Sequence, residues 1–378
     1  MNIKEFQAGI QKQQYQYKSF TPALINHAWV VSDGDILRLL SDADRVLGEL
    51  NAFSQLVPDV DFFIRMHITK EATQSSRIEG TQTNMEEALL DAQDIEPDKG
   101  DDWVEVQNYI SAINEAIEQL EHLPLSNRLL KATHHTLMQG ARGETKQPGE
   151  FRNSQNWIGM SLKNALFIPP HQDEVADLMS DLEKFIHNDE ASVPHLIKIA
   201  IAHYQFETIH PFLDGNGRLG RLMIALYFAS FGLLHKPALY LSDYFERNKT
   251  AYVDHLMAVR EANKMEAWLA FFLHGVRETA ENSIQVFKSI LLMKERLERE
   301  VLPRFSTRRQ ANAQKLMRHL YQLPLVNIKQ VAQLLAVNTN TAAAMVGDFE
   351  KYGILKELTG KRRNRTFWFH EYVLIFSR

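Results

Sequence analysis

Two apolar segments of the chain are joined by the stretch His210-Pro211-Phe212-Leu213-Asp214-Gly215-Asn216-Gly217-Arg218-Leu219-Gly220-Arg221. Apolar residues lie on nearly every side of the segment 195–209, which predicts a central helix with little exposure to solvent. Pro211 ends this helix, and a second apolar helix begins near residue 216. Apolar residues with helical spacing recur along much of the remaining chain, so the sequence predicts a mainly α body.

The loop within this stretch has the composition of an anion-binding site. Gly215 and Gly217 leave backbone N–H groups free of Cβ obstruction, and the helix that follows adds the positive end of its dipole. Arg218 and Arg221 lie three residues apart in the first turn of that helix, so both guanidinium groups can reach one anionic group. The sequence therefore predicts a loop that binds phosphate groups.

Two further side chains of the loop suit the transfer of a phosphate-containing group. Asp214 is a hard oxygen ligand directly before the glycines, where Mg²⁺ would bridge two phosphates. His210 has an intrinsic pKa near neutrality and can accept a proton from an incoming hydroxyl group. Each residue alone is more often structural, but together they form a complete set for phosphoryl or nucleotidyl transfer. We interpret His203, which lies in the apolar helix, as a hydrogen-bonded core residue and not as a metal ligand.

An additional helix and a hairpin are predicted from local patterns. The spacing of apolar residues predicts a helix over residues 62–80 with Gly80 as its stop, which places Ser75 and Glu79 on one face. Residues 156–170 contain two short apolar runs around a polar stretch, which predicts a β-hairpin set into the helical body.

Residues 210–221 resemble the signature of the Fic family, His-x-Phe-x-Asp/Glu-Gly-Asn-Gly-Arg-x-x-Arg, at every specified position. The resemblance implies a Fic-type helical bundle that transfers AMP from ATP to a Tyr, Thr or Ser hydroxyl group of a target protein. His210 would be the catalytic base, and Asp214 would bind Mg²⁺. The resemblance also implies a set of nucleotide-binding residues at the start of the second helix: Gly215, Asn216, Gly217, Arg218, Leu219, Gly220 and Arg221.

The run from Ser75 to Gly80 is similar to the inhibitory signature of the same family, Ser/Thr-x-x-x-Glu-Gly/Asn. The resemblance implies that Glu79 pairs with Arg221, occupies the γ-phosphate position and keeps the activity low. In some members of the family the same glutamate is thought to position water for the removal of AMP, and the sequence leaves both directions open.

Two other segments are assigned from the resemblance. The hairpin over 156–170 resembles the family's flap, which would present a target protein by strand addition, and a purely structural hairpin is the alternative. Residues 240–252 resemble the segment after the family's core, so Tyr244 and Asn248 are candidates for contacts with the adenine base. Residues 262–268 depart from the Gly-Asp-Trp-Glu of many relatives, which leaves selectivity for the base open.

The charge distribution separates the C-terminal segment from the body. Residues 303–378 carry 13 Lys and Arg against 4 Asp and Glu, whereas the first 302 residues carry 29 against 43. Three predicted helices and a hairpin with a basic tip in this segment resemble a winged helix-turn-helix domain. Lys361, Arg362, Arg363 and Arg365 would then contact phosphates of DNA, so a transcriptional regulator is one alternative function. A transferase for another phosphate-containing group is a second alternative, because relatives with the same loop move other groups.

Length and composition set the remaining expectations. At 378 residues the chain is expected to form several domains, which we place at 1–110 (N-terminal helical region), 111–276 (catalytic core), 277–302 (linker helix) and 303–378 (winged helix). The chain has no cysteine, which excludes disulfides and thiolate metal sites. No leader or membrane-spanning segment is apparent, so we expect a cytoplasmic protein, a homodimer, without membrane contact.

Overall fold

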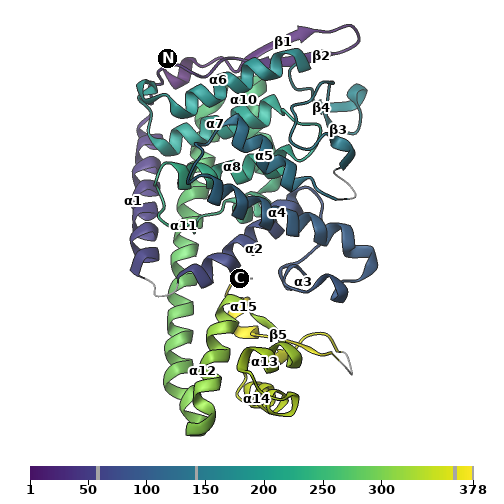
Figure 1. The fold of residues 1–378 in the computed structure, drawn as a ribbon. Helices are drawn as coiled ribbons and strands as arrows, with labels where there is room; N and C mark the ends of the chain where they lie inside the picture. The colour runs from purple at the N-terminus through teal and green to yellow at the C-terminus, as the bar shows by residue number, and fades with distance from the viewer. Residues whose placement is uncertain (57–59, 141–143, 361–363, 377–378) are drawn as a thin grey trace.

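The computed structural model describes residues 1–56, 60–140, 144–360 and 364–376, and in this part of the chain most residues are helical. The body consists of helices that surround a central pair, α7 (His195–Ile209) and α8 (Asn216–Ser230), as Figure 1 shows. The other helices of the body are α1 (Gly34–Leu56), α2 (Val60–Ile78), α3 (Met85–Ala88), α4 (Gly100–Gln119), α5 (Asn127–Leu137), α6 (Val175–His187), α9 (Ser242–Arg247), α10 (Lys249–Ala262) and α11 (Met265–Arg296), and of these the short α3 lies at the periphery, against α2 and α4.

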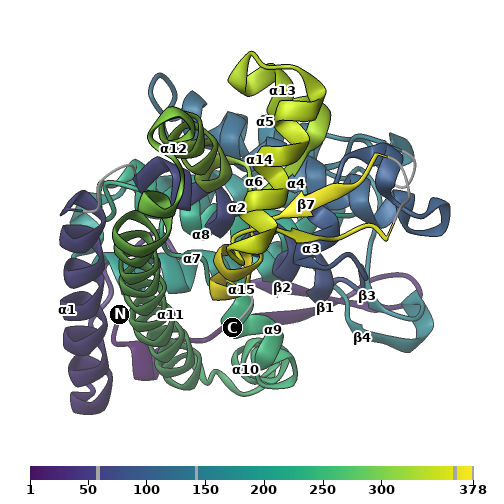
Figure 2. The same cartoon turned by 90° about the horizontal axis from the view of Figure 1, so that it is seen from below.

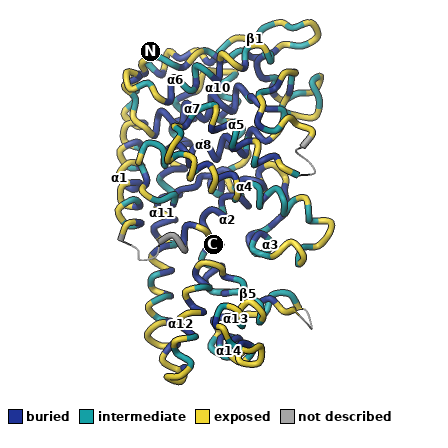
Figure 3. The backbone as a smooth tube through the Cα atoms, viewed as in Figure 1, coloured by how far each residue is buried: buried dark blue, intermediate teal, exposed yellow. Residues whose placement is uncertain are grey.

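The central position of α7 follows from its composition. Every residue from Leu196 to Ile209 is buried, so the prediction of a central helix is confirmed, and Figure 3 shows the buried backbone concentrated in this region. α8 is almost equally enclosed, with apolar residues on most of its surface. A helix that is apolar all round requires neighbours on every side, and this requirement explains the surrounding layer of helices.

Two hairpins lie at one end of the body. The predicted hairpin is present as β3 (Ile158–Gly159) and β4 (Ala165–Phe167), which pair antiparallel. The expectation of a helical N-terminal region is wrong for residues 9–22, which form the antiparallel strands β1 (Gly9–Gln13) and β2 (Lys18–Pro22). The reason is a tertiary contact, because the N–H of Phe20 donates to the carbonyl oxygen of Ile168 and the Phe20 ring packs against Phe167.

The predicted inhibitory helix is present with slightly shifted ends. α2 runs over Val60–Ile78 and not 62–80, and Gly80 follows it with a positive φ of 107°. Two other helices cross positions where we expected domain limits, because α4 continues through residue 110 and α11 through residue 276. α11 is long and carries the chain from the body to the C-terminal segment (Figure 1).

The C-terminal segment contains the elements predicted from its sequence and two that were not. The three predicted helices begin at Thr307, Ile328 and Thr339, and side-chain caps from Asn327 and Asn338 start the second and third. The described elements are α12 (Thr307–Gln322), β5 (Leu325–Asn327), α13 (Ile328–Leu335), α14 (Thr339–Lys351), β6 (Lys356–Glu357), β7 (Thr366–Trp368) and α15 (His370–Phe376), with sheet order β5-β7-β6. Lys361, Arg362 and Arg363 of the predicted basic tip lie outside the described residues.

α2 is packed against the C-terminal segment by an aromatic cluster. The ring of Phe63 lies 6.3 Å from the rings of both Tyr321 and Tyr372, and the imidazole of His67 lies 5.1 Å from the ring of Phe376. Figures 1 and 2 show α15 at this junction between the body and the C-terminal segment. The N-terminal half of α2 therefore packs against the C-terminal segment, whereas Ser75 lies in its last turn and Glu79 directly follows it.

Candidate functional site

The loop between α7 and α8 is held in shape by its own residues. His210 and Gly215 both have left-handed backbone conformations, with φ values of 50° and 73°, and they turn the chain at the two ends of the loop. The buried side-chain amide of Asn216 accepts the N–H of Phe212 and donates to its carbonyl oxygen, both at 2.8 Å. Asn216 therefore braces the loop with its side chain, so only its backbone is available for the predicted contact with a nucleotide.

His134 of α5 supports the loop from outside. Its Nε2 lies 3.0 Å from the carbonyl oxygen of Asp214, and its Nδ1 accepts the N–H of Gly149 at 2.8 Å. Because Nδ1 is an acceptor, Nε2 carries the proton and donates to Asp214. The imidazole also stacks on the ring of Phe212, with centroids 3.8 Å apart. Burial lowers the pKa of His134 to about 4, so the ring is neutral at pH 7 and keeps this tautomer.

Arg152 and Asn156 connect the loop to the flap hairpin. The guanidinium group of Arg152 donates to the carbonyl oxygens of His210 at 2.9 Å and Pro170 at 2.6 Å. The amide of Asn156 donates to the carbonyl oxygens of His210 and Phe212. A guanidinium group at the C-terminal end of α7 also meets the negative end of the helix dipole. The loop and the flap are thus one braced unit.

Sequence reasoning missed these three supporting residues. His134, Arg152 and Asn156 each contact a backbone carbonyl oxygen that lies 54 to 80 positions away in the chain. Because every residue type has such an oxygen, the sequence at the partner position gives no sign of the contact. The signal that could have found them was the buried polar side chain itself, since a polar group in an apolar surrounding requires a partner.

His210 is placed at the end of α7 with a neutral imidazole. Burial and the positive charges of Arg260 and Arg152 lower the pKa of His210 to about 4, against an opposing effect of Glu79. Its Nδ1 is buried near the backbone of Glu207, which also opposes the lowering of the pKa. A neutral imidazole with a lone pair can accept a proton at pH 7, which suits a general base.

Arg221 is bound by the two residues of the predicted inhibitory motif. Its Nε donates to the hydroxyl group of Ser75 at 2.9 Å, and one of its terminal N–H groups reaches the carbonyl oxygen of Ser75 at 2.8 Å. The same terminal nitrogen lies 2.7 Å from Oε1 of Glu79. The structure therefore brings together Ser75, Glu79 and Arg221 as the sequence predicts.

The carboxylate of Glu79 also lies at the N-terminal end of α8. A Cβ atom placed on Gly217 would be 2.3 Å from Oε1 of Glu79, so only glycine leaves room for this carboxylate. Desolvation alone would raise the pKa of Glu79, but the charge and hydrogen bond of Arg221 and the charge of Arg218 outweigh it and lower the pKa. An ionised carboxylate thus occupies the place that a helix N-terminus and a guanidinium group make favourable for an anion.

Arg218 has a different environment from Arg221. Its guanidinium group is buried and lies 3.5 Å from a carboxylate oxygen of Glu105 on α4 and 3.6 Å from the sulfur of Met138. It lines a cleft of about 1030 Å³, including the part open to solvent, together with Glu79, Asp214 and Glu105. The carboxylate of Asp214 is exposed and accepts the N–H of Gly215 at 2.6 Å. Arg218 and Asp214 therefore face one cleft, as expected from the sequence.

The remaining predicted nucleotide-binding residues lie away from this cleft. Leu219 is fully buried, and Gly220 faces α7. Tyr244 packs between Phe271 and Gly275 of α11, and the amide of Asn248 donates to the carbonyl oxygen of Tyr244 at 2.9 Å. Neither Tyr244 nor Asn248 is among the residues that line the cleft.

His203 has the core role that we expected. Its Nδ1 lies 3.0 Å from the carbonyl oxygen of Gly220, and its Nε2 lies 2.8 Å from the hydroxyl group of Tyr252. Both ring nitrogens are therefore bound within the core. In the described part of the chain, no three His, Asp or Glu side chains are grouped so that they could hold a metal ion.

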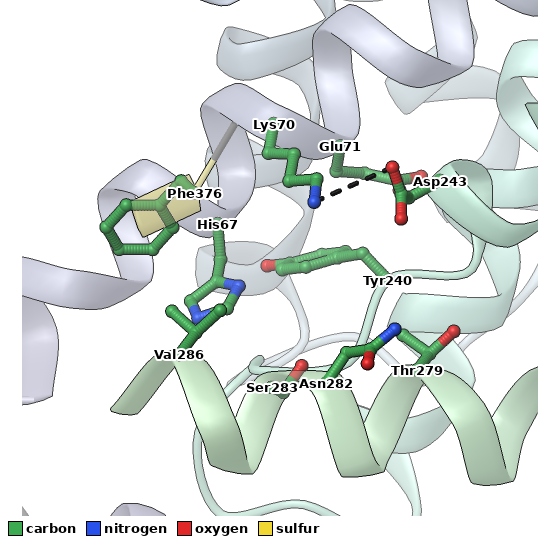
Figure 4. Close-up of a pocket in the computed structure, with 10 residues that line it drawn as sticks. All are labelled: His67, Lys70, Glu71, Tyr240, Asp243, Thr279, Asn282, Ser283, Val286 and Phe376. Carbon is green, nitrogen blue, oxygen red and sulfur yellow. Dashed lines mark ion pairs between the residues drawn. The ribbon is translucent and has the colours of Figure 1, made fainter. Parts of the chain in front are cut away.

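A second cavity lies near the middle of α2, and Figure 4 shows its lining. His67 and Tyr240 face it, and among the described residues neither His67 Nε2 nor the Tyr240 hydroxyl group has a hydrogen-bond partner. Lys70 pairs with Asp243 across one side at 3.6 Å. No residue of the loop 210–221 lines this cavity, so we do not assign it to the site.

The flap presents apolar side chains to solvent. Trp157, Met160 and Leu166 are exposed by 42%, 92% and 57%. The inner residue Phe167 is buried and lies under the guanidinium group of Arg260, which is 4.0 Å from its ring centre. These exposed apolar side chains form a surface at which contact with another chain would bury apolar area.

Comparison with known proteins identifies the family. Residues 37–118 match the family model described as Fic/DOC family N-terminal, and residues 124–228 match the model described as Fic/DOC family. The chain is 39% identical over 77 residues to the protein adenylyltransferase Fic of Drosophila melanogaster, which is 20% of this chain and 14% of the relative. It is 33% identical over 140 residues to the protein of the same name from Aedes aegypti, which is 37% of this chain and 25% of the relative. The chain thus spans at most about a quarter of the length of these two relatives.

Solved structures support the fold. A Fic family protein from Desulfovibrio desulfuricans covers 90% of this chain and 97% of its own, with a TM-score of 0.56 and 19% identity. A Fic domain containing signaling protein from Bacteroides thetaiotaomicron covers 68% of this chain and 97% of its own, with a TM-score of 0.52 and 16% identity. Among the described helices, none combines the length and the apolar character that crossing a membrane requires.

Proposed function

Because the chain belongs to the Fic/DOC family, we propose that it is a protein adenylyltransferase that transfers AMP from ATP to a hydroxyl group of a target protein, and that Glu79 restrains this reaction. The curated relatives that it resembles carry the name protein adenylyltransferase, which supports the reaction class.

The position of the Glu79 carboxylate is the observation that carries the proposal. This carboxylate lies 2.7 Å from Arg221 and against Gly217, at the N-terminal end of α8. A site that holds a carboxylate between a helix N-terminus and a buried guanidinium group also suits a phosphate group. ATP would then compete with Glu79 for Arg221, and with Glu79 in place its α-phosphorus would be misaligned for attack.

The residues of the loop can perform the transfer in one step. His210, neutral at pH 7, takes the proton of the target hydroxyl group as its oxygen attacks the α-phosphorus. The new bond joins that oxygen to the α-phosphorus, and the bond between the α-phosphorus and the oxygen that leads to the β-phosphate breaks, so pyrophosphate leaves. Arg218, Arg221 and the N–H groups at the start of α8 stabilise the negative charge on the phosphates.

Asp214 would hold Mg²⁺ at this site. Its exposed carboxylate lines the same cleft as Arg218, and Mg²⁺ commonly takes one or two carboxylates from the protein and the rest of its ligands from phosphates and water. A single acidic side chain beside a phosphate-binding loop therefore fits the ion. Once bound with the nucleotide, Mg²⁺ would neutralise charge on the phosphates.

The target protein would dock on the flap. The flap is tied to the loop through Arg152 and Asn156, so a main chain added to it would have a fixed distance from His210. Recognition through main-chain hydrogen bonds would place the hydroxyl group with little demand on the side chains around it.

Labelling with ATP tests the proposal. Wild-type protein, Glu79→Gly and Glu79→Gly/His210→Ala are incubated with Mg²⁺ and α-labelled ATP, and intact mass is measured for self-modification. We expect an added AMP in Glu79→Gly, little in the wild type and none in the double variant. Glu121→Gly is the matched control, because Glu121 is exposed in the turn after α4. An adduct with a mass other than that of AMP would indicate a transferase for another phosphate-containing group, and no adduct in any variant would refute the proposal.

A second function is favoured by the C-terminal segment, which we propose to be a winged helix that binds DNA. The excess of basic residues over residues 303–378 supports it, as does the exposed start of α14 at Thr339, Asn340 and Thr341. A gel-shift experiment with duplex DNA at increasing salt tests it, since binding through phosphates weakens steeply with salt. Absence of a shift at low salt would favour a protein-binding role.

A further inference from the structure

Two carboxyl groups approach the first turns of α8 at two glycines of one helix face. Gly217 and Gly220 lie three residues apart, and a Cβ atom on either would meet a glutamate oxygen, Glu79 Oε1 at 2.3 Å and Glu207 Oε1 at 2.2 Å. Glu79 comes from the end of α2 and Glu207 from the last turn of α7. Arg221 follows directly, one turn after Gly217, so a single guanidinium group stands near both carboxyl groups.

Glu207 has no part in the mechanism proposed above, although it is buried beside the site. Glu207 is 6% exposed, and its Oε1 has no hydrogen-bond partner in the part of the chain that the structure describes. The pKa of Glu207 is raised to about 7, because burial and the negative charge of Glu79 together outweigh the positive charges of Arg221 and Arg260. The hydroxyl group of Tyr252, on α10, is a further ionisable group near Glu207.

Arg221 needs a negative partner at all times. Its side chain is buried, and Glu79 is the carboxylate within direct pairing distance among the described residues. A buried guanidinium group that loses its partner is strongly destabilised. Another buried glutamate, Glu71, interacts electrostatically with Arg221, but its carboxyl oxygens already accept hydrogen bonds from Tyr109 and Ser242. Glu207, with an unbound oxygen, is therefore the group that can respond when Glu79 moves.

We propose that Glu207 is the reserve counter-charge of Arg221. It is protonated while Glu79 pairs with Arg221, it releases its proton when Glu79 withdraws, and it takes a proton up again when an anionic phosphate group replaces Glu79. Glu207 is thus a positioning residue, which keeps Arg221 in place between the restrained state and the nucleotide-bound state. The last of these steps rests on the proposed function, whereas the first two concern the protein alone.

A stability cycle without nucleotide tests the first two steps. Melting temperatures are measured at pH 6 and pH 8 for the wild type, Glu79→Gly, Glu207→Gln and Glu79→Gly/Glu207→Gln. We expect Glu79→Gly to lower the melting temperature less at pH 8 than at pH 6, because at pH 8 Glu207 can ionise and replace Glu79. When Glu207→Gln is already present, Glu79→Gly should lower the melting temperature by the same amount at both pH values. Glu71→Gln is the matched control, and it should leave the pH dependence in place.

Infrared spectroscopy provides a measurement that does not need the Glu207 variant to fold. The carbonyl band of a protonated buried carboxyl group should be present in the wild type at pH 6.5 and weaker in Glu79→Gly at the same pH. A carbonyl band of equal strength in the wild type and Glu79→Gly would overturn the proposal. So would an effect of Glu79→Gly on the melting temperature that depends on pH in the same way with Glu207 and with Glu207→Gln.

Binding of ATP separates this proposal from the proposed function. In the Glu79→Gly/His210→Ala protein, which cannot turn over, the dissociation constant of ATP should rise between pH 7 and pH 8.5, by at most about tenfold per pH unit for one proton taken up. The added Glu207→Gln substitution should remove this rise. If the stability cycle and the infrared result hold but ATP does not bind, the reserve role stands and the proposed function fails. If ATP binds with equal pH dependence in both proteins, the uptake of a proton on binding is refuted.

Discussion

The guanidinium group of Arg221 is bound to Ser75 through two hydrogen bonds and to Glu79 through one, so the end of α2 holds it at three points. The two partners differ in kind. Ser75 is neutral and fixes the direction of the guanidinium group, whereas Glu79 is negative and occupies the anion position against Gly217. Restraint should therefore reside in Glu79, and Ser75 should serve mainly to aim Arg221.

The first prediction separates these two roles. Glu79→Gly should raise the rate of AMP incorporation by about ten- to a hundredfold, the range that a realigned reacting group accounts for. Ser75→Ala should raise it much less, because the backbone carbonyl of Ser75 still binds Arg221 and Glu79 stays in place. Rates are measured with α-labelled ATP at saturation. Equal stimulation by the two substitutions would show that the restraint is not electrostatic.

The second prediction concerns the support of the loop by His134. His134→Ala should lower the free energy of unfolding by about 2–4 kcal/mol, because it removes a buried ring and leaves Asp214 O and Gly149 N without their partner. It should also reduce incorporation of AMP in the Glu79→Gly background.

Denaturant unfolding of His134→Ala and of His135→Ala gives the comparison. His135 is exposed on the same helix, and its ring contacts the carbonyl oxygen of Pro148 at 3.4 Å, a weak interaction whose loss should have little effect. Similar destabilisation by both substitutions would show that the helix, and not the support of the loop, is responsible.

The third prediction uses Gly220, where α7 and α8 are in close contact. Gly220→Ala should destabilise the protein by about 1–3 kcal/mol, because its Cβ would meet Glu207 at 2.2 Å and the Phe206 ring at 3.0 Å. Gly347 of α14 is the control, since a Cβ there meets no atom within 4 Å. Gly347→Ala should stabilise by about 0.5–1 kcal/mol through helix propensity. A stable Gly220→Ala protein would contradict the close approach of Glu207.

The extent to which the sequence predicts this site depends on the range of the interactions. The pairing of Glu79 with Arg221 could be predicted because both residues belong to motifs with fixed spacing, and the burial of α7 could be predicted because its apolar residues lie on all sides. His134, Arg152 and Glu207 could not, because each acts on a backbone atom or a glycine that another element brings close. Tyr244 and Asn248 stay predictions as base contacts, and in the structure their side chains take part in helix packing and capping.

The N-terminal hairpin shows the same limit for the fold. Residues 9–22 have a mixed pattern, and they become strands because Phe20 pairs with the end of the flap at Ile168. A contact between residues so far apart in the chain is set by tertiary structure, which overrides weak local preference.

The last prediction concerns the pH dependence of the transfer. Burial and the charges of Arg260 and Arg152 lower the pKa of His210 to about 4, and the base form is the neutral one, present above this value. The rate at saturating ATP should therefore stay nearly constant from pH 8 down to about pH 5 and fall at lower pH. An imidazole with an ordinary pKa of about 6.5 would instead lose about thirtyfold by pH 5.

The measurement is made in Glu79→Gly, where loss of the Glu79 charge lowers the pKa of His210 further and so extends the constant range. Glu79→Gly/Glu207→Gln serves as the control, because it removes the other group that titrates near pH 7. Far-UV circular dichroism at each pH excludes unfolding as the cause of a lost rate. A fall centred near pH 6.5 in both proteins would mean that His210 is solvated during the reaction, and the burial that keeps it neutral in the free protein would then not persist in the complex with ATP.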